Sequence, residues 1–338
     1  MNNGTDKESH ILKFEENLSK KIIMPDKLTN VTLITRFLLM GFPDDQVLQR
    51  LFAAFFSLVY LAALMGNLLI ITLTTTDQRL QTPMYFFLKY LSLIDICYIS
   101  VTVSKSIINS LTNSHSISFV GCASQVFLVV SFAGTEFALL LVMSYDRYAA
   151  ICCPLHYEAI MNRGACMQMV TTSWFSGFVY GSIHVAGTFS VHFCGPNIVH
   201  QFFCDIPSLL TLACSGEQIL EYVLIIVSFC FVFVCFTFMV ASYVFIVSTV
   251  LRIPSPQGRF RTFSTCMPHL TVVSMFLSSV YIAHLGLNSK SPSSLNVFMS
   301  VLYSLLPPSL NPVIYSLRNR DMRVVLWKFF GEKVTLSI

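Results

Sequence analysis

The sequence contains little charge. Asp, Glu, Lys and Arg together make up 11% of its 338 residues, whereas soluble domains carry about 25%. Hydrophobic residues make up 54% instead, and the mean hydropathy is +0.68. This balance excludes an ordinary soluble domain and indicates a membrane protein whose length is used mainly for membrane spans.

Several signatures of function are also missing. No basic run and no zinc-ligand spacing indicates a nucleic-acid partner, and the net charge of +4 is dispersed. Neither a Gly-rich phosphate loop nor a Gly-x-Ser-x-Gly elbow occurs. The histidines of the predicted spans, His184, His269 and His284, have no carboxylate neighbours in sequence. We therefore expect neither an enzyme nor a nucleic-acid-binding protein.

Seven stretches reach the roughly 20 mostly apolar residues that a membrane span needs. They are residues 50–75, 83–106, 122–148, 166–187, 219–250, 262–285 and 295–317. Lipid offers no hydrogen-bond partner to unpaired backbone groups, so all of them should be helices. We predict an all-α membrane protein, with a seven-transmembrane helix bundle over residues 50–317. A transporter is the first alternative, but the sequence shows none of the internal repeats that are typical of transporters.

Charge in the loops orients this bundle. The predicted loops after spans one, three and five are basic, whereas the long loop 188–218 has no Lys or Arg. Basic loops stay on the cytoplasmic side, so we expect a multi-pass plasma-membrane protein with tail 1–49 outside and tail 318–338 inside. Lysines in tail 1–49 argue against this orientation, although long tails follow the rule poorly. The alternation of basic and aromatic residues in tail 318–338 predicts a short amphipathic helix on the lipid of the inner leaflet.

Four motifs follow one another along the chain. Residues 83–88 read Pro-Met-Tyr-Phe-Phe-Leu, 143–152 read Met-Ser-Tyr-Asp-Arg-Tyr-Ala-Ala-Ile-Cys, 263–270 read Phe-Ser-Thr-Cys-Met-Pro-His-Leu and 311–315 read Asn-Pro-Val-Ile-Tyr. In these motifs the chain resembles the odorant (olfactory) receptor family of rhodopsin-like (class A) G-protein-coupled receptors, tetrapod class II type. The resemblance implies a receptor that binds small volatile odorants and activates a stimulatory, olfactory-type heterotrimeric G protein, which raises cAMP. The alternative within the family is a chain that signals little.

The resemblance also assigns roles to residues. It implies that Arg147 pairs with Asp146 in the inactive receptor and enters the G-protein cavity in the active one; the alternative is an Arg that only extends to lipid headgroups. The predicted coupling residues are Asp146, Arg147, Tyr148, Tyr243, Asn311, Pro312 and Tyr315, and Tyr243 is expected to meet Tyr315 on activation. Residues 276–279 read Phe-Leu-Ser-Ser where the family commonly has Phe-Tyr-Gly-Thr, so the usual aromatic switch is missing.

Two carboxylates, Asp95 and Glu136, lie inside predicted spans, where charged residues are usually functional and partnered. The resemblance implies a sodium or proton site at these residues, completed by Asn67 and Asn311. The alternative is two neutral carboxylic acids with local hydrogen bonds. An allosteric sodium ion is the only cofactor and the only metal that we expect.

Four cysteines fall where an oxidising exterior is predicted. They permit three pairings, and the resemblance implies the bridges Cys122–Cys204 and Cys194–Cys214. Glycosylation sequons stand in the outer tail at Asn3, Asn17 and Asn30. The resemblance favours Asn30, and it places the usual family start near Met24, so that residues 1–23 form an extension.

Helical periodicity, counted from Arg147 and Tyr243 and combined with the family's geometry, predicts a ligand pocket. Its residues are Val126, Val129, Val130, Ala133, Gly134, Val227, Ser228, Phe231, Val280, Tyr281, His284 and Ser304. No carboxylate stands at Val129 to bind an amine, and span seven has no Lys to hold retinal. The lining suits a small, neutral, mainly hydrophobic molecule; the alternative for each residue is helix packing.

Overall fold

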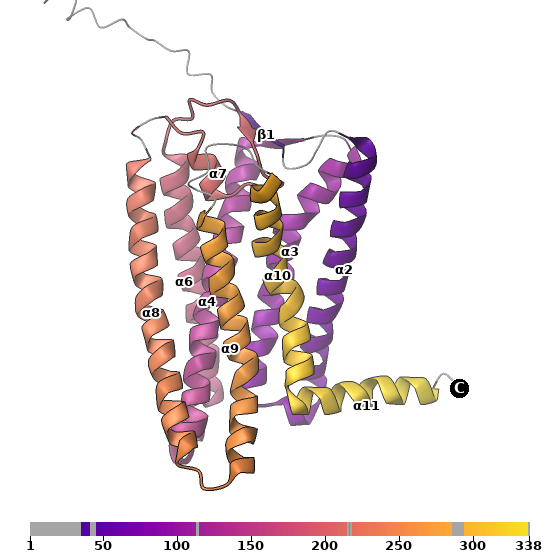
Figure 1. The fold of residues 1–338 in the computed structure, drawn as a ribbon, viewed down its shortest axis with the longest axis vertical. Helices are drawn as coiled ribbons and strands as arrows, with labels where there is room; N and C mark the ends of the chain where they lie inside the picture. Colours follow the sequence, from indigo (N-terminus) through magenta and orange to yellow (C-terminus); the bar gives the residue numbers. More distant parts are fainter. Residues whose placement is uncertain are drawn as a thin grey trace, which may run out of the picture. The chain divides into compact units, whose positions relative to one another are not determined.

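The computed structural model describes residues 35–40, 45–112, 115–214, 216, 218–285 and 294–336. Within them, long helices run alongside one another as a bundle (Figure 1). They are α2 (Gln46–Thr76), α3 (Pro83–Thr112), α4 (Phe119–Cys152), α6 (Arg163–Phe189), α8 (Ile219–Leu251), α9 (Pro256–Leu285) and α10 (Ser294–Arg318). Each helix corresponds to one predicted span, so the predicted bundle is confirmed.

Composition alone qualifies six of the described helices as membrane spans: α2, α3, α4, α8, α9 and α10 are long and apolar enough. The helix α6 has 27 residues but is rich in Gly, Ser and Thr. A Cβ on Gly177 would lie 2.0 Å from Thr135 Oγ1, and one on Gly181 would lie 2.1 Å from Ser131 Oγ. Small residues let two helix backbones approach closely, so α6 joins the bundle by packing its glycines against α4.

The apolar core lies where the helices face one another. Leu91, Leu139 and Val272 are fully buried there. Large apolar side chains on the outside are instead exposed, such as Leu58 at 69% and Phe233 at 66%. A soluble protein does not expose so much apolar surface, whereas lipid would cover it.

Polar side chains in the connections determine where several helices begin. Asp45 accepts hydrogen bonds from the backbone N–H groups of Val47 and Leu48 at 2.8 and 3.0 Å. Ser118 and Asn162 cap α4 and α6 in the same way. Such caps satisfy N–H groups that have no partner in the first helical turn.

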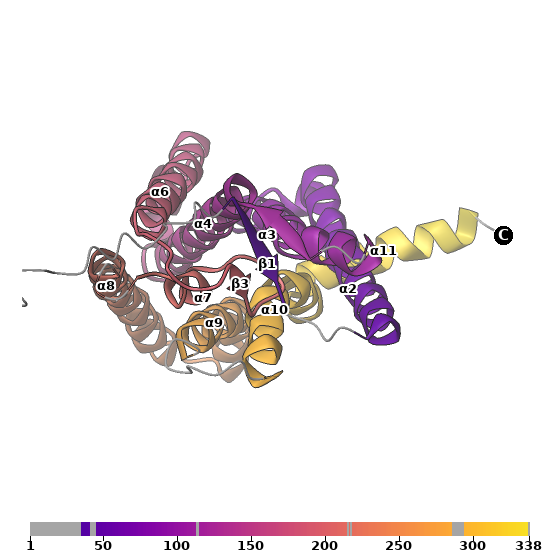
Figure 2. The ribbon, with the colours of Figure 1, turned by 90° about the horizontal axis from the view of Figure 1, so that it is seen from above.

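Three short strands lie at one end of the bundle, which we call the sheet end. They are β1 (Arg36–Leu39), β2 (Ser116–Ser118) and β3 (Ile198–Val199). Strand β1 pairs antiparallel with β2 and parallel with β3. The segment that follows β3 contains α7 (Ile206–Leu210) and lies over the middle of the helices when the bundle is seen from above (Figure 2).

The opposite end, which we call the α11 end, holds short helices that connect the long ones. They are η1 (Gln78–Leu80), η2 (Pro154–His156) and α5 (Tyr157–Ile160). The helix α11 (Arg320–Leu336) runs across this end rather than along the bundle (Figure 1). It buries Met322 and Val325 and exposes Arg323 and Trp327. It is therefore the amphipathic helix predicted in the last segment of the chain.

Candidate functional site

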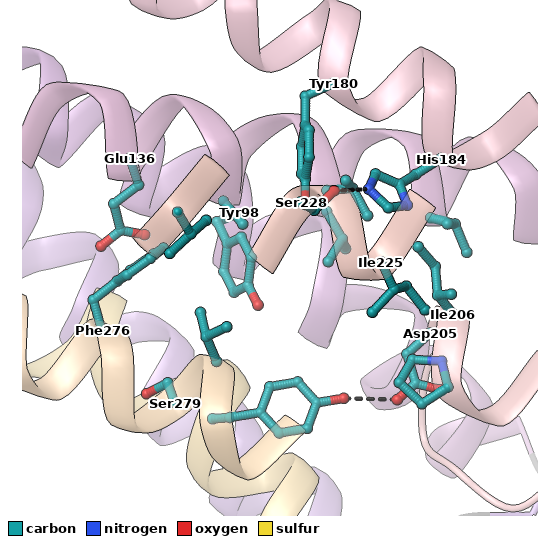
Figure 3. Close-up of a pocket in the computed structure, with 18 of the residues that line it drawn as sticks. Tyr98, Glu136, Tyr180, His184, Asp205, Ile206, Ile225, Ser228, Phe276 and Ser279 are labelled. Carbon is teal, nitrogen blue, oxygen red and sulfur yellow. Dashed lines mark hydrogen bonds between the residues drawn. The ribbon is translucent and has the colours of Figure 1, made fainter. Parts of the chain in front are cut away.

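A cavity of about 200 Å³ lies between the helices, toward the sheet end. Side chains from α3, α4, α6, α8, α9 and α10 line it, and α7 with the residues before it covers it. Figure 3 shows Tyr98, Glu136, His184, Ser228 and Phe276 around this space. An enclosed, mainly apolar space with a few polar groups is the usual form of a small-molecule site.

Several predicted pocket residues line this cavity. They are Val126, Val129, Val130 and Ala133 on α4, Ser228 on α8 and Val280 on α9. Their contact with a ligand stays a prediction.

Three residues that the sequence analysis assigned to the pocket instead point out of the bundle. Val227 and Phe231 on α8 are 59% and 64% exposed, and Tyr281 on α9 is 63% exposed. Each is adjacent to a residue that does line the cavity or lies within one turn of one. A shift of one residue along a helix turns a side chain by about 100°, which moves it from the cavity to the lipid face.

Two more predicted pocket residues, one half-buried and one buried, do not line the cavity. Gly134 faces α6, where a Cβ on it would lie 3.1 Å from Tyr180 Cδ1. Ser304 is fully buried, and its Oγ donates a hydrogen bond to Ser300 O at 2.7 Å. Helix packing, the alternative for each pocket residue, applies to both.

The sequence reasoning missed the part of the lining that comes from α6 and from the loop before α7. Tyr180 and His184 lie on α6, and Phe203 and Asp205 lie in the loop. A signal for the loop residues was present: Cys122 precedes the lining residues of α4, so a bridge to Cys204 brings the residues beside Cys204 over the cavity.

A buried polar cluster interrupts the apolar wall. His184 Nδ1 lies 2.7 Å from Glu221 Oε1, and His184 Nε2 lies 3.0 Å from Ser228 Oγ. The Tyr180 ring packs edge-on against His184, with ring centroids 4.6 Å apart. His184 and Glu221 are 37 residues apart in sequence, which is why no carboxylate was found beside this histidine.

Glycine makes room for the carboxylate of this cluster. Glu221 is fully buried in the first turn of α8. A Cβ on Gly187 would lie 2.2 Å from Glu221 Oε2. The tight approach of α6 and α8 at this glycine therefore brings Glu221 within reach of His184.

The loop over the cavity is held by polar contacts with three helices. The Cys204 backbone N–H donates to Gln125 Oε1 on α4 at 2.9 Å. Tyr303 on α10 donates its hydroxyl hydrogen to Asp205 Oδ2 at 2.8 Å. Ser106 on α3 donates to the backbone of the same loop. Burial raises the pKa of the Asp205 carboxyl above its ordinary value, although its hydrogen bonds oppose the shift.

Both disulfides that the resemblance implied are present. Cys122–Cys204 joins α4 to the loop, with Cα atoms 5.6 Å apart and a sequence separation of 82. Cys194–Cys214 closes a segment with a separation of 20. The first bridge ties the cover of the cavity to its wall.

The predicted polar core lies next to the cavity. Asn311 Nδ2 donates to both carboxylate oxygens of Asp95, at 3.2 and 3.0 Å, and to Glu136 Oε1 at 3.3 Å. All three side chains are buried, and Glu136 also lines the cavity. One amide thus connects two carboxyl groups from α3 and α4 to α10.

Asn67 contacts the backbone of α10, and its place in the polar core stays a prediction. Its Nδ2 donates to Pro308 O at 2.9 Å rather than to the carboxyl groups. Pro312 lacks the N–H that would occupy this carbonyl in an α-helix, so Asn67 replaces the missing bond. Gly66 permits the contact, since a Cβ there would lie 3.0 Å from Pro312 Cβ.

The predicted pair of Asp146 and Arg147 is present at the α11 end. Arg147 donates to the fully buried Asp146 through Nε at 3.0 Å and through a terminal nitrogen. Tyr157 of α5 donates its hydroxyl hydrogen to the other carboxylate oxygen at 2.8 Å. Tyr148 packs edge-on against Phe245 of α8. Sequence reasoning did not find Tyr157.

A histidine links three helices, among them the helix of Tyr243, which the coupling prediction involves. His269 of α9 lies 2.9 Å from Leu140 O on α4, so its Nε2–H donates there. Its Nδ1 then accepts from Tyr243 of α8 at 2.6 Å. The Tyr315 hydroxyl is buried and has no hydrogen-bond partner among the described residues. A Tyr243–Tyr315 contact on activation stays a prediction.

Some predicted positions lie outside the described residues. They are the sequons at Asn3, Asn17 and Asn30, the extension 1–23, and the side chain of His284.

The sequence comparisons agree on one family, and the structural comparison agrees on the fold. The family profile described as "Olfactory receptor" matches residues 56–333. Olfactory receptor 14A16 from Homo sapiens is 51% identical over 308 residues, covering 91% of this chain and 99% of that protein. Olfactory receptor 14L1 from Homo sapiens is 54% identical over 302 residues, covering 89% and 93%. The structure of squid rhodopsin superposes with a TM-score of 0.68 at 17% identity, covering 87% of this chain and 83% of that one.

Proposed function

This chain belongs to the olfactory receptor family and has the rhodopsin-like fold of a signalling receptor, and we propose that its ligand is a small, neutral, mainly hydrophobic odorant held in the cavity. The family implies a small-molecule ligand, G-protein coupling and a multi-pass membrane protein rather than an enzyme. The observation that carries the proposal is the mainly apolar cavity between the helices.

The size and charge of the cavity support this ligand class. A cavity of about 150 Å³ is large enough for benzene, and this one is about 200 Å³. Two carboxyl groups belong to the lining, and each already accepts a hydrogen bond: Glu136 from Asn311 and Asp205 from Tyr303. No carboxylate stands at Val129, which also lines the cavity.

We place the sheet end outside the cell and the α11 end in the cytoplasm. Basic side chains at the α11 end support this orientation, among them Arg79, Arg163, Arg252 and Arg259, because basic loops stay inside. The odorant would bind the state with an open α11 end more tightly and so shift the population toward it. Arg147 would leave Asp146 in that state and contact a stimulatory, olfactory-type G protein, which raises cAMP.

We also propose a sodium ion at the polar core. Asn67 Oδ1 and Asn311 Oδ1 are buried and have no partner among the described residues, and the carboxyl groups of Asp95 and Glu136 lie around Asn311 Nδ2. Hard cations prefer such oxygen donors, so the residues present fit the ion; a shared proton is the alternative. Replacing sodium by a bulky organic cation should change odorant affinity in the wild type and leave Glu136→Gln unchanged.

The proposed function is tested by cAMP accumulation in cells that express the full chain with a stimulatory G protein. A panel of volatile neutral odorants should contain molecules that raise cAMP, and Arg147→Ala at matched surface level should abolish the response. A response that persists in Arg147→Ala contradicts the coupling role. No response to any odorant at good surface expression contradicts the proposed ligand class.

A further inference from the structure

The cavity has one polar group of unusual construction. Ser228 and His184 both line the cavity and face each other (Figure 3). The fully buried Glu221 lies at the other ring nitrogen of His184, so that Glu221, His184 and Ser228 form a continuous row. Glu221 Oε2 has no hydrogen-bond partner among the described residues. Burying a carboxylate and an imidazole in an apolar wall is costly, so the row needs a reason beyond packing.

The row fixes the direction of its hydrogen bonds. A carboxylate can only accept, so Glu221 takes a hydrogen bond from His184 Nδ1, 2.7 Å away. In the neutral imidazole the nitrogen that carries the hydrogen donates and the other accepts, so Nε2 accepts when Nδ1 donates. Ser228 must then donate its only hydroxyl hydrogen to Nε2, over 3.0 Å.

Ser228 consequently offers only lone pairs to the cavity. A hydroxyl has one hydrogen and two acceptor lone pairs, and His184 uses the hydrogen. A ligand hydroxyl could donate a hydrogen bond to the Ser228 oxygen. A carbonyl or ether oxygen has no hydrogen to donate, so it would only repel that oxygen.

We propose that the cavity is selective for alcohols or phenols, whose hydroxyl group donates a hydrogen bond to Ser228 Oγ; this inference rests on the cavity being the odorant site. The rest of the lining is mainly apolar and receives the hydrocarbon part. The volume of about 200 Å³ fits alcohols and phenols of about six to ten heavy atoms, since benzene needs about 150 Å³. Carboxylic acids are disfavoured, because a second negative charge would lie close to Glu221.

The first test uses the wild-type chain and matched ligands, so it does not depend on a variant that folds. Alcohols and phenols are compared with the methyl ether and the ketone of the same skeleton. Binding is read as thermal stabilisation of the purified full-length receptor, and signalling as cAMP. The account expects an apparent affinity about fivefold to tenfold higher for the hydroxyl compounds, which corresponds to one net hydrogen bond.

The second test uses single variants of Ser228 and Glu221 and a control variant of Ser279. Ser228→Ala should remove the preference for hydroxyl compounds over their ethers, and Glu221→Gln should reduce it because the row loses its fixed direction. Ser279→Ala is the matched control: Ser279 also lines the cavity, but its hydroxyl donates to Met275 O of its own helix at 2.9 Å. This control should keep the preference.

The outcomes separate the two proposals. Equal or better binding of ketones or ethers by the wild type overturns the inference, and odorant-evoked cAMP in the same cells leaves the proposed function intact. Stabilisation by hydroxyl compounds without any cAMP response supports the inference and contradicts the proposed coupling. A Ser228→Ala receptor that keeps the full hydroxyl preference also overturns the inference.

Discussion

At the scale of single residues, Asp146 shows how a buried charge restrains the α11 end. Its carboxylate is fully buried and accepts from Arg147 on one oxygen and from Tyr157 on the other. A buried carboxylate that loses one donor bears a desolvation cost. The two donors therefore hold Asp146 and Arg147 together, which under the proposed function would keep Arg147 from reaching a G protein.

Replacing Tyr157 with Phe removes one of these donors without changing the ring. We expect basal cAMP to rise, by up to about fivefold, because one hydrogen bond is worth about 1 kcal/mol to the closed state. Tyr281→Phe serves as a control, since Tyr281 is exposed at the far end of the bundle. Unchanged basal activity in Tyr157→Phe at equal surface level would argue against this restraint.

Asp205 predicts a pH dependence of stability. Burial raises the pKa of this carboxyl above its ordinary value of 3.8, so the folded receptor binds the proton more tightly than the unfolded chain. Its contribution to stability is therefore fully present below pH 3.8 and declines as the pH rises through the raised value. The melting temperature of the purified receptor should fall more over this window in the wild type than in Asp205→Asn. If the melting temperatures of the wild type and of Asp205→Asn fell equally over this pH window, the raised pKa of Asp205 would be contradicted.

At the scale of helices, the contact between α4 and α6 depends on the absence of side chains. Gly177 faces Thr135 and the backbone oxygen of Ser131, where an added Cβ would come within 2.0 and 2.5 Å. Neither the backbone of α4 nor a hydroxyl bonded to it can move aside easily. This close contact also brings Tyr180 and His184 of α6 to the cavity.

Gly177→Ala should accordingly weaken the bundle. Overpacking typically costs about 1–3 kcal/mol, which should appear as a lower melting temperature and a lower surface level. Gly331→Ala on α11 adds the same methyl group where no atom lies within 4 Å, and it should behave like the wild type. If both variants melted alike, the close packing of α6 on α4 would be refuted.

The helices also show where the sequence predicts well and where it does not. Charged motifs located Arg147 correctly, and the inward face of α4 counted from it was right at Val126, Val129, Val130 and Ala133. On α8 nearly every residue is apolar, so no amphipathic pattern distinguishes the cavity face from the lipid face. Counting from the distant Tyr243 therefore included Val227 and Phe231 in error.

Contacts between distant parts of the chain could not be predicted from the sequence, for a different reason. Glu221 meets His184 across 37 residues, and Asn67 meets Pro308 across 241. No local periodicity records such contacts, because they depend on how helices pack against one another. The loop over the cavity was predictable only in outline, from the bridge between Cys122 and Cys204.

At the scale of the whole molecule, direct contacts link the cavity to the segment of α10 that leads to the α11 end. Glu136 lines the cavity and meets Asn311. Asn311 begins the motif that contains Pro312 and the buried Tyr315. A ligand that moves Glu136 on α4 would thus act directly on Asn311 and the segment of α10 that the resemblance assigns to coupling.

The fold, the family and the general ligand class could be predicted from motifs, whereas the residues that line the cavity are determined by helix packing.

The central claim is that an odorant in this cavity drives the receptor. The most direct measurement is the cAMP dose–response to one active odorant for two variants that introduce the same side chain. Ala133→Phe fills the cavity, whereas Val227→Phe adds the ring on the lipid face of α8, where Val227 is 59% exposed. At matched surface level, Ala133→Phe should lose at least about tenfold in potency, which corresponds to about 1.4 kcal/mol, and Val227→Phe should respond like the wild type. A full response from Ala133→Phe, or a loss confined to Val227→Phe, would contradict the account.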